Sequence, residues 1–227
     1  MACTYISSYL YLLVINFFIT ASIMLRTAIE FLSGELKGYI EKKEPAMFKN
    51  EIAVVPSSLM KTDGTFAVGN SQDGKSFKII MTLVNLEEDR IADSQSYFQK
   101  QNDKIQFFNT PVNLNAYILF SVLGDNYLSD LRLLSLIISF FQSNPVFDEE
   151  RFPNINSKVE DDMSWQRVGK LITNLHSLTM EQQNNMWAAI GAKYMPNVVY
   201  KIRTISFTDN EPKMEAPPVT DIRILDN

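Results

Sequence analysis

The chain is poor in the residues that carry most enzyme chemistry. Its 227 residues include one cysteine, Cys3, and one histidine, His176. A single cysteine excludes a disulfide within the chain and a thiolate metal site, and a single histidine excludes a histidine-rich metal centre. A Ser-His-Asp triad would have to use His176. Because the sequence shows no convergent partners for this histidine, which ends an expected strand, we expect it to be structural.

Signals for phosphate and nucleic-acid binding are also missing. The glycines of "TDGTFAVGNSQDG" (residues 62–74) match neither a P-loop nor a dinucleotide fingerprint, so we expect turns there. The net charge is −5, whereas nucleic-acid binding needs clustered Lys and Arg. Even the pair Lys42 and Lys43 lies between Glu41 and Glu44. The sequence therefore predicts no enzyme, no cofactor, no catalytic or metal site and no nucleic-acid partner.

Three carboxylates, Glu87, Glu88 and Asp89, stand together in "VNLEEDR" (residues 84–90). A metal-binding or catalytic role would require a second set of ligands elsewhere, and none has a recognisable spacing. We therefore expect this segment to be a solvated strand end.

The first 25 residues carry no charge, and this length is enough to span a bilayer. The segment lacks the basic region of a secretory signal, and its polar residues weaken it as an anchor. It is either a membrane anchor or upstream sequence read in frame before a start at Met24. Membrane fractionation of the full chain, compared with a chain beginning at Met24, separates the two interpretations.

The remaining pattern predicts an α+β domain. Helical spacing marks residues 25–42, residues 126–144 and the apolar positions from Met180 to Tyr194, and strand spacing marks residues 52–56, 77–89, 112–123, 167–178 and 198–207. Residues 90–110 are polar and suggest a mobile excursion, and a short strand is possible at 222–225. Because the long strands alternate rather than run fully apolar, we expect a mainly antiparallel or mixed sheet flanked by about three helices in one domain.

The unit from Thr179 to Phe207 has clear boundaries. Thr179 and Gln182 form a capping-box pattern, and Gly191 and Pro196 end the helix. Trp187 lies on the apolar face of this helix, so we expect it to be a core residue rather than a ligand contact.

Four stretches in order carry a resemblance to a known family. They are "IEFLSGELKGYI", "IIMTLVNLEEDR", "PVNLNAYILFSVLGDNYLSDLRLLSLIISFFQSNPVF" and "LTMEQQNNMWAAIGAKYMPNVVYKIRTISF". Together the sequence resembles the cap or tail-terminator proteins of contractile injection systems, of the virulence-cassette and antifeeding-prophage type. The resemblance divides the chain into a hydrophobic leader (1–23), a tail-terminator-like α+β domain (24–208) and a proline-containing tail (209–227).

The resemblance implies a structural assembly protein. Such proteins form a six-subunit ring on the distal end of the inner tube and the last sheath layer, and they end polymerisation at a set length. The implied partners are the tube and sheath proteins of the same particle, which is assembled in the bacterial cytoplasm and released extracellularly. Two alternatives remain: a membrane-tethered binding protein anchored by residues 1–25 at the inner membrane, and a hydrolase using His176.

Overall fold

The computed structural model describes residues 25–49, 51–68, 76–89, 97–101, 104–108, 112–124, 126–159, 167–207 and 214–216. The leader at 1–23 and the possible strand at 222–225 lie outside these ranges. Within the described part of the chain, none of the helices combines the length and apolar character needed to cross a membrane.

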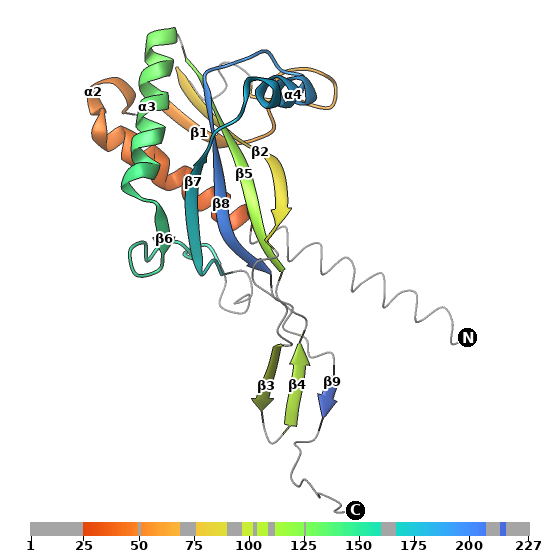
Figure 1. The fold of residues 1–227 in the computed structure, drawn as a ribbon. Coiled ribbons are helices and arrows are strands. Elements are labelled where there is room, and N and C mark those ends of the chain that lie inside the picture. The colour runs from red at the N-terminus through yellow and green to blue at the C-terminus, as the bar shows by residue number, and fades with distance from the viewer. Residues whose placement is uncertain are drawn as a thin grey trace, which may run out of the picture.

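Six strands form the main sheet in the order β1-β2-β5-β8-β7-β6 (Figure 1). The first pair, β1 with β2, is parallel, and every other neighbouring pair is antiparallel. The strands are β1 (Ile52–Pro56), β2 (Phe77–Glu88), β5 (Val112–Leu123), β6 (Val146–Asp148), β7 (Lys170–His176) and β8 (Asn197–Phe207). The expected mixed, mainly antiparallel sheet of an α+β fold is confirmed.

One face of this sheet is covered by helices. They are the helix at 25–43, the short α2 (Pro45–Phe48) and α3 (Tyr127–Ser143). Aromatic rings join α3 to the central strands: Phe141 lies 5.2 Å from Phe120 and 4.3 Å from Tyr200 between ring centroids. These rings belong to one apolar core that continues into the helix at 25–43 through Leu32, Leu36 and Ile40. Most of the chain's burial lies in this layer.

The opposite face is covered only in part, by α4 (Met180–Ile190) and by the segment at 59–68, whose Leu59 is buried in the same core (Figure 1). The predicted capping box is present, with Gln182 N–H donating to Thr179 Oγ1 at 3.2 Å and Thr179 N–H donating to the Gln182 side chain at 2.9 Å. Gly191 ends the helix at φ 73°, a conformation that glycine adopts without strain. Trp187 is 5% exposed and packs in a second core with Ile80 and Leu119. The prediction that Trp187 is a core residue is confirmed.

The register of the central strands shifts at two places. The β2–β5 ladder shifts between Leu83 and Asn85, and the β5–β8 ladder shifts between Leu114 and Ala116. Such irregularities bend a strand and break its alternation. Asn115, which lies inside the second shift, is buried although its side chain is polar. In residues 77–82 and 116–122, successive side chains therefore alternate between the two faces of the sheet. This alternation is interrupted at the register shifts, where the strands extend beyond the two cores.

A second sheet is formed by the segments that follow the C-terminal ends of β2 and β8. It contains β3 (Tyr97–Gln101), β4 (Lys104–Phe108) and β9 (Met214–Ala216), in the order β3-β4-β9 and antiparallel throughout. The chain enters it from β2, returns to the main sheet through β5, and re-enters it after β8 (Figure 1). Strand β9 falls within the tail at 209–227.

Residues 90–110, for which the polar sequence suggests a mobile excursion, contain two strands. Residues 97–101 and 104–108 pair as the hairpin β3–β4. Polar and apolar residues alternate from Lys104 to Phe107, which is a strand pattern, whereas residues 97–101 are two aromatic residues followed by three polar ones and show no alternation. The pairing partner β9 lies more than a hundred residues away along the chain, so no local signal predicts it.

Replacing Trp187 tests the α4 core. We expect Trp187→Ala to lower the free energy of unfolding by about 3–5 kcal/mol, because it removes a large buried side chain from a packed site. The indole Nε1 has no hydrogen-bond partner among the described residues, so Trp187→Phe loses less than the alanine variant. Urea unfolding measures both. A Trp187→Ala chain as stable as the parent contradicts the assignment to the core.

Candidate functional site

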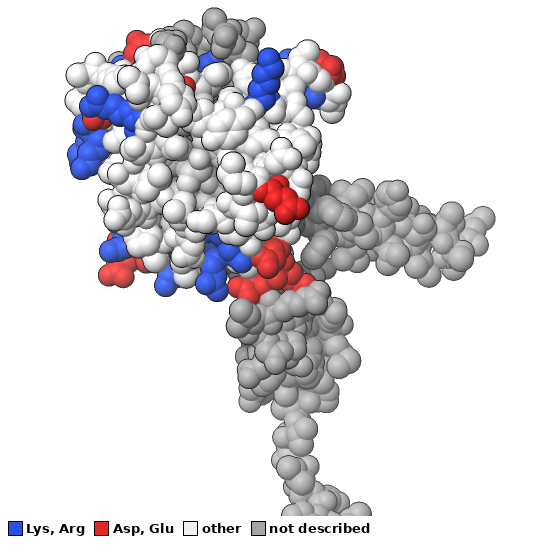
Figure 2. All heavy atoms as spheres, turned by 45° about the horizontal axis from the view of Figure 1, so that its top comes forward, with Lys and Arg blue, Asp and Glu red and all other residues white. Residues whose placement is uncertain are grey.

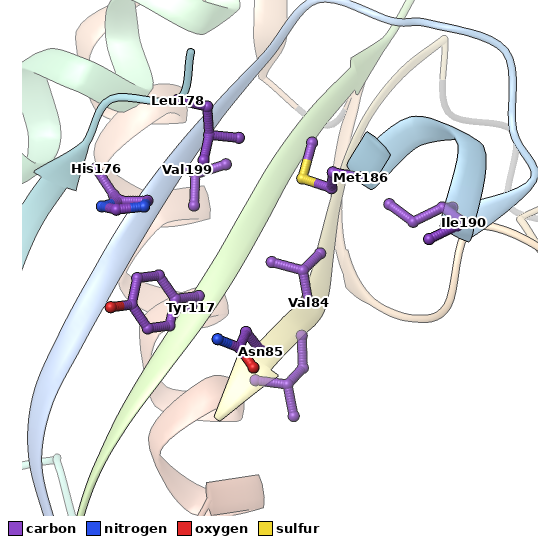
Figure 3. Close-up of a pocket in the computed structure, with 10 residues that line it drawn as sticks. Val84, Asn85, Tyr117, His176, Leu178, Met186, Ile190 and Val199 are labelled. Carbon is purple, nitrogen blue, oxygen red and sulfur yellow. The ribbon is translucent and has the colours of Figure 1, made fainter. Parts of the chain in front are cut away.

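A hollow of the described surface lies beside α4 on the partly covered face. We call it the α4 groove, with a volume of about 490 Å³. Five elements bound it: the strands β2, with Val84 and Asn85, β5, β7 and β8, and the helix α4 (Figure 3). Its walls are Leu83, Val84, Leu178, Met186, Ala189, Ile190 and Val199, and its polar lining is Asn85, Tyr117 and His176. The groove exists because α4 is shorter than the sheet that it covers.

A hydrogen-bonded cluster joins three strands at the polar end of the groove. Tyr117 Oη donates to Glu87 Oε2 at 2.6 Å, and Lys201 Nζ donates to the same oxygen at 2.8 Å. The Lys201 ammonium also lies 5.2 Å from the centroid of the Tyr117 ring, within cation–π range. Charge and hydrogen bonds therefore fix one carboxylate on β2 to β5 and β8.

This cluster stabilises the charged forms of its members. The hydrogen bond from Lys201, followed by that from Tyr117, holds the pKa of Glu87 below the ordinary glutamate value. The hydrogen bond to Glu87 correspondingly raises the pKa of Lys201. Because both groups contact solvent, the pair positions side chains more than it stabilises the fold.

His176 lies in the groove wall and is not arranged as a catalytic base. Its ring packs against Tyr117 at 4.9 Å between centroids, edge to face. Within the described residues, no Ser or Thr hydroxyl and no carboxylate is hydrogen-bonded to it. The geometry offers a nucleophile no base, so it gives the hydrolase alternative no support.

Two of the three carboxylates of residues 84–90 form ion pairs with residues of β8. Glu87 pairs with Lys201, and Asp89 lies 3.6 Å from Arg203. No group of three or more His, Cys, Asp or Glu side chains in the described ranges is arranged to hold a metal ion. The expected strand end is therefore linked to β8 by ion pairs. The sequence alone did not reveal these contacts, because Lys201 and Glu87 are 114 residues apart along the chain.

Charge is unevenly placed around the body. Figure 2 shows charged side chains of both signs around the border of this view, with Asp and Glu beside the grey atoms and Lys and Arg next to them at the lower edge, and a broad uncharged surface between. The acidic end of β2 consists of Glu87, Glu88 and the following Asp89. The α4 groove is thus a mostly apolar surface with a polar end.

The family of the chain follows from its match to known sequences. The family profile of the Pvc16 N-terminal domain matches residues 27–221. The chain belongs to the Pvc16 N-terminal domain family. This family match covers the main sheet, both helical layers and β9, so it includes every element described above and confirms the resemblance found in the sequence.

Two solved structures of contractile particles share the fold. One is the sheath/tube terminator of PVC, an extracellular contractile injection system, in its extended state. It matches with a TM-score of 0.52 at 12% identity, covering 85% of this chain and 62% of that chain. The other is the tube terminating cap of the anti-feeding prophage, with a TM-score of 0.50 at 12% identity, covering 83% of this chain and 59% of that chain.

The chain spans about three fifths of the length of these two terminators. At 12% identity the likeness establishes the fold and not the individual contacts. No curated protein matches the sequence.

The cluster around Glu87 predicts a pH effect of defined sign. Because the folded pKa of Glu87 lies below the unfolded value, its contribution to stability is present above the ordinary glutamate range and is lost as pH falls through the lowered folded pKa. Carboxyl NMR titration should give a midpoint for Glu87 below the ordinary glutamate value. We expect Lys201→Met to move the midpoint upward; an unchanged midpoint contradicts the assigned pairing.

Proposed function

We propose that the chain is the structural cap of a contractile phage-tail-like injection particle. In this role it sits on the distal end of the inner tube and the last sheath layer and stops their growth. Its partners are the tube and sheath proteins of the same particle, and identical copies form the ring, six by resemblance. The particle is assembled in the cytoplasm and released outside the cell.

The observation that carries the proposal is the extent of the fold match. A terminator structure covers 85% of this chain in one alignment, and the Pvc16 N-terminal domain match runs from residue 27 to 221. A match of this extent places the sheet and both helical layers in the same fold as terminators, rather than one common motif. The share of those terminators that has no counterpart here is a further reason to treat their contacts with tube and sheath as proposals for this chain.

The surface chemistry supports a stoichiometric role. The groove is apolar, its one histidine packs against a tyrosine ring, and its charged groups are bound to one another. The outer strands of the main sheet, β1 and β6, add edges at which another chain can pair, as in β-strand addition. We therefore propose that the chain works through protein contacts and is not an enzyme.

Deleting the gene tests the capping role. Without a cap, tube and sheath polymerise beyond the set length, so we expect particles of irregular length that still carry baseplates. Negative-stain electron microscopy measures the length distribution, and a plasmid copy of the gene should restore a single length. Uniform particles of normal length in the deletion strain contradict the cap assignment.

A further inference from the structure

The second sheet ends in an open edge. Because its strand order is β3-β4-β9, strand β9 has β4 on one side and, among the described residues, no strand on the other. An edge strand presents backbone N–H and C=O groups that can pair with a further strand. Residues 217–227 follow β9 along the chain and lie outside the described ranges. The chain that leaves β9 at Ala216 is therefore next to this edge from its first residue.

The register of the second sheet divides its residues between two faces. Residues that stand opposite one another in neighbouring strands lie on the same face, and successive residues of one strand alternate between the faces. Two rows on one face are mostly apolar, with Phe98, Phe107 and Met214 in the first and Lys100, Ile105 and Ala216 in the second. The row between them, on the other face, is polar and consists of Gln99, Gln106 and Glu215. At the open edge, an acidic position therefore stands between two apolar positions.

The sequence that follows β9 has the complementary pattern. Residues 217–221 (PPVTD) begin with two prolines, and proline is favoured at the first corner of a turn. Hairpin loops of this length are common. Strand spacing then resumes at residues 222–225 (IRIL), where a basic residue stands between two isoleucines. The edge and the tail thus carry matching alternations of apolar and charged positions, with charges of opposite sign.

A hairpin with residues 217–221 as its loop fixes one register between β9 and the tail. Three pairs result: Ile222 with Ala216, Arg223 with Glu215, and Ile224 with Met214. Both apolar rows gain an isoleucine, and opposite charges face each other in the polar row, an arrangement that stabilises neighbouring strands. A shift of one residue moves Arg223 to the apolar face and both isoleucines to the polar face, so the pattern of residues selects this register.

The N-terminal segment is a poorer fit to the same edge. Residues 1–25 contain no charged side chain, so they offer no cation to the acidic position of β9. A tethered segment also binds at a high effective concentration, whereas a segment of another molecule depends on the protein concentration. Charge and tethering therefore favour the tail of the same chain.

We propose that residues 222–225 form a fourth strand on the open edge of β9 in the same chain. This strand covers backbone groups at which an edge otherwise adds a strand from another molecule, so the tail blocks that edge. The match to the Pvc16 N-terminal domain ends at residue 221, and the proposed strand lies just beyond it. The proposal concerns the single chain and does not depend on the capping role.

Paired cysteines in the purified full chain test the register. Directly opposite residues of antiparallel strands have Cα atoms about 4.5–5.5 Å apart, which a disulfide can bridge. In a Cys3→Ser background, Met214→Cys with Ile224→Cys should form a disulfide within the chain under mild oxidation, with loss of both free thiols. Met214→Cys with Leu225→Cys is the matched control, because Leu225 is the next residue and lies on the other face; its thiols should stay free. Peptide mapping by mass spectrometry identifies the bonds.

Charge exchange tests the pairing of Glu215 with Arg223. We expect Glu215→Lys to reduce the hydrogen-exchange protection of the backbone amides of residues 222–225, and the double variant Glu215→Lys, Arg223→Glu to restore it. Asp226→Lys makes the same change of charge beyond the strand and should leave the protection intact. Circular dichroism melting curves that match the parent show that the main sheet is folded in each variant.

Several results overturn the proposal. They are amides at 222–225 that exchange as fast as an unfolded peptide in the parent chain, a cysteine pair at 214 and 224 that cross-links no faster than the pair at 214 and 225, a Glu215→Lys chain that keeps full protection, or a double variant that does not regain it. A disulfide between chains rather than within one also overturns it, by assigning the edge to the tail of another molecule. These tests need only the purified chain, so their failure leaves the particle-length test of capping intact.

Discussion

Burial of β5 on both of its faces is the interaction on which the other layers depend. Ile118 and Phe120 enter the core beneath α3 and the helix at 25–43, while Leu119, between them, enters the core beneath α4. A strand that is apolar on both faces gains burial only if separate layers cover both. The neighbours β2 and β8 follow the same rule through Ile80 and Val199, so the central strands fix where α4 docks and where its cover ends.

The incomplete second layer is what gives the molecule a contact surface. With 11 residues, α4 covers only part of its sheet face, and the strands continue beyond it with Asn85, Tyr117 and Lys201 on the exposed side. In this part of the sheet the polar side chains are hydrogen-bonded to one another, as Glu87 is to Tyr117 and Lys201. The result is a mostly apolar surface with a polar end.

Local pattern predicted most of the main sheet, and distance along the chain explains what it missed. Strand bounds at residues 52–56 and 112–123 and the capping box at Thr179 are read directly from spacing and cap chemistry, and the structure confirms them. The pairing of β4 with β9 and the bond from Lys201 to Glu87 join segments about a hundred residues apart, and no window of sequence contains both partners. The groove was missed for the same reason: its walls come from four strands and one helix.

The central claim, that a chain of the Pvc16 N-terminal domain family acts as a distal cap, is tested most directly by its position in assembled particles. A short epitope placed after Asn227, detected with gold-labelled antibody on intact particles, reports that position without altering the fold described here. The account predicts gold at one end only, opposite the baseplate, on nearly every particle. Label along the sheath, at the baseplate, or on free protein with none on particles would contradict it.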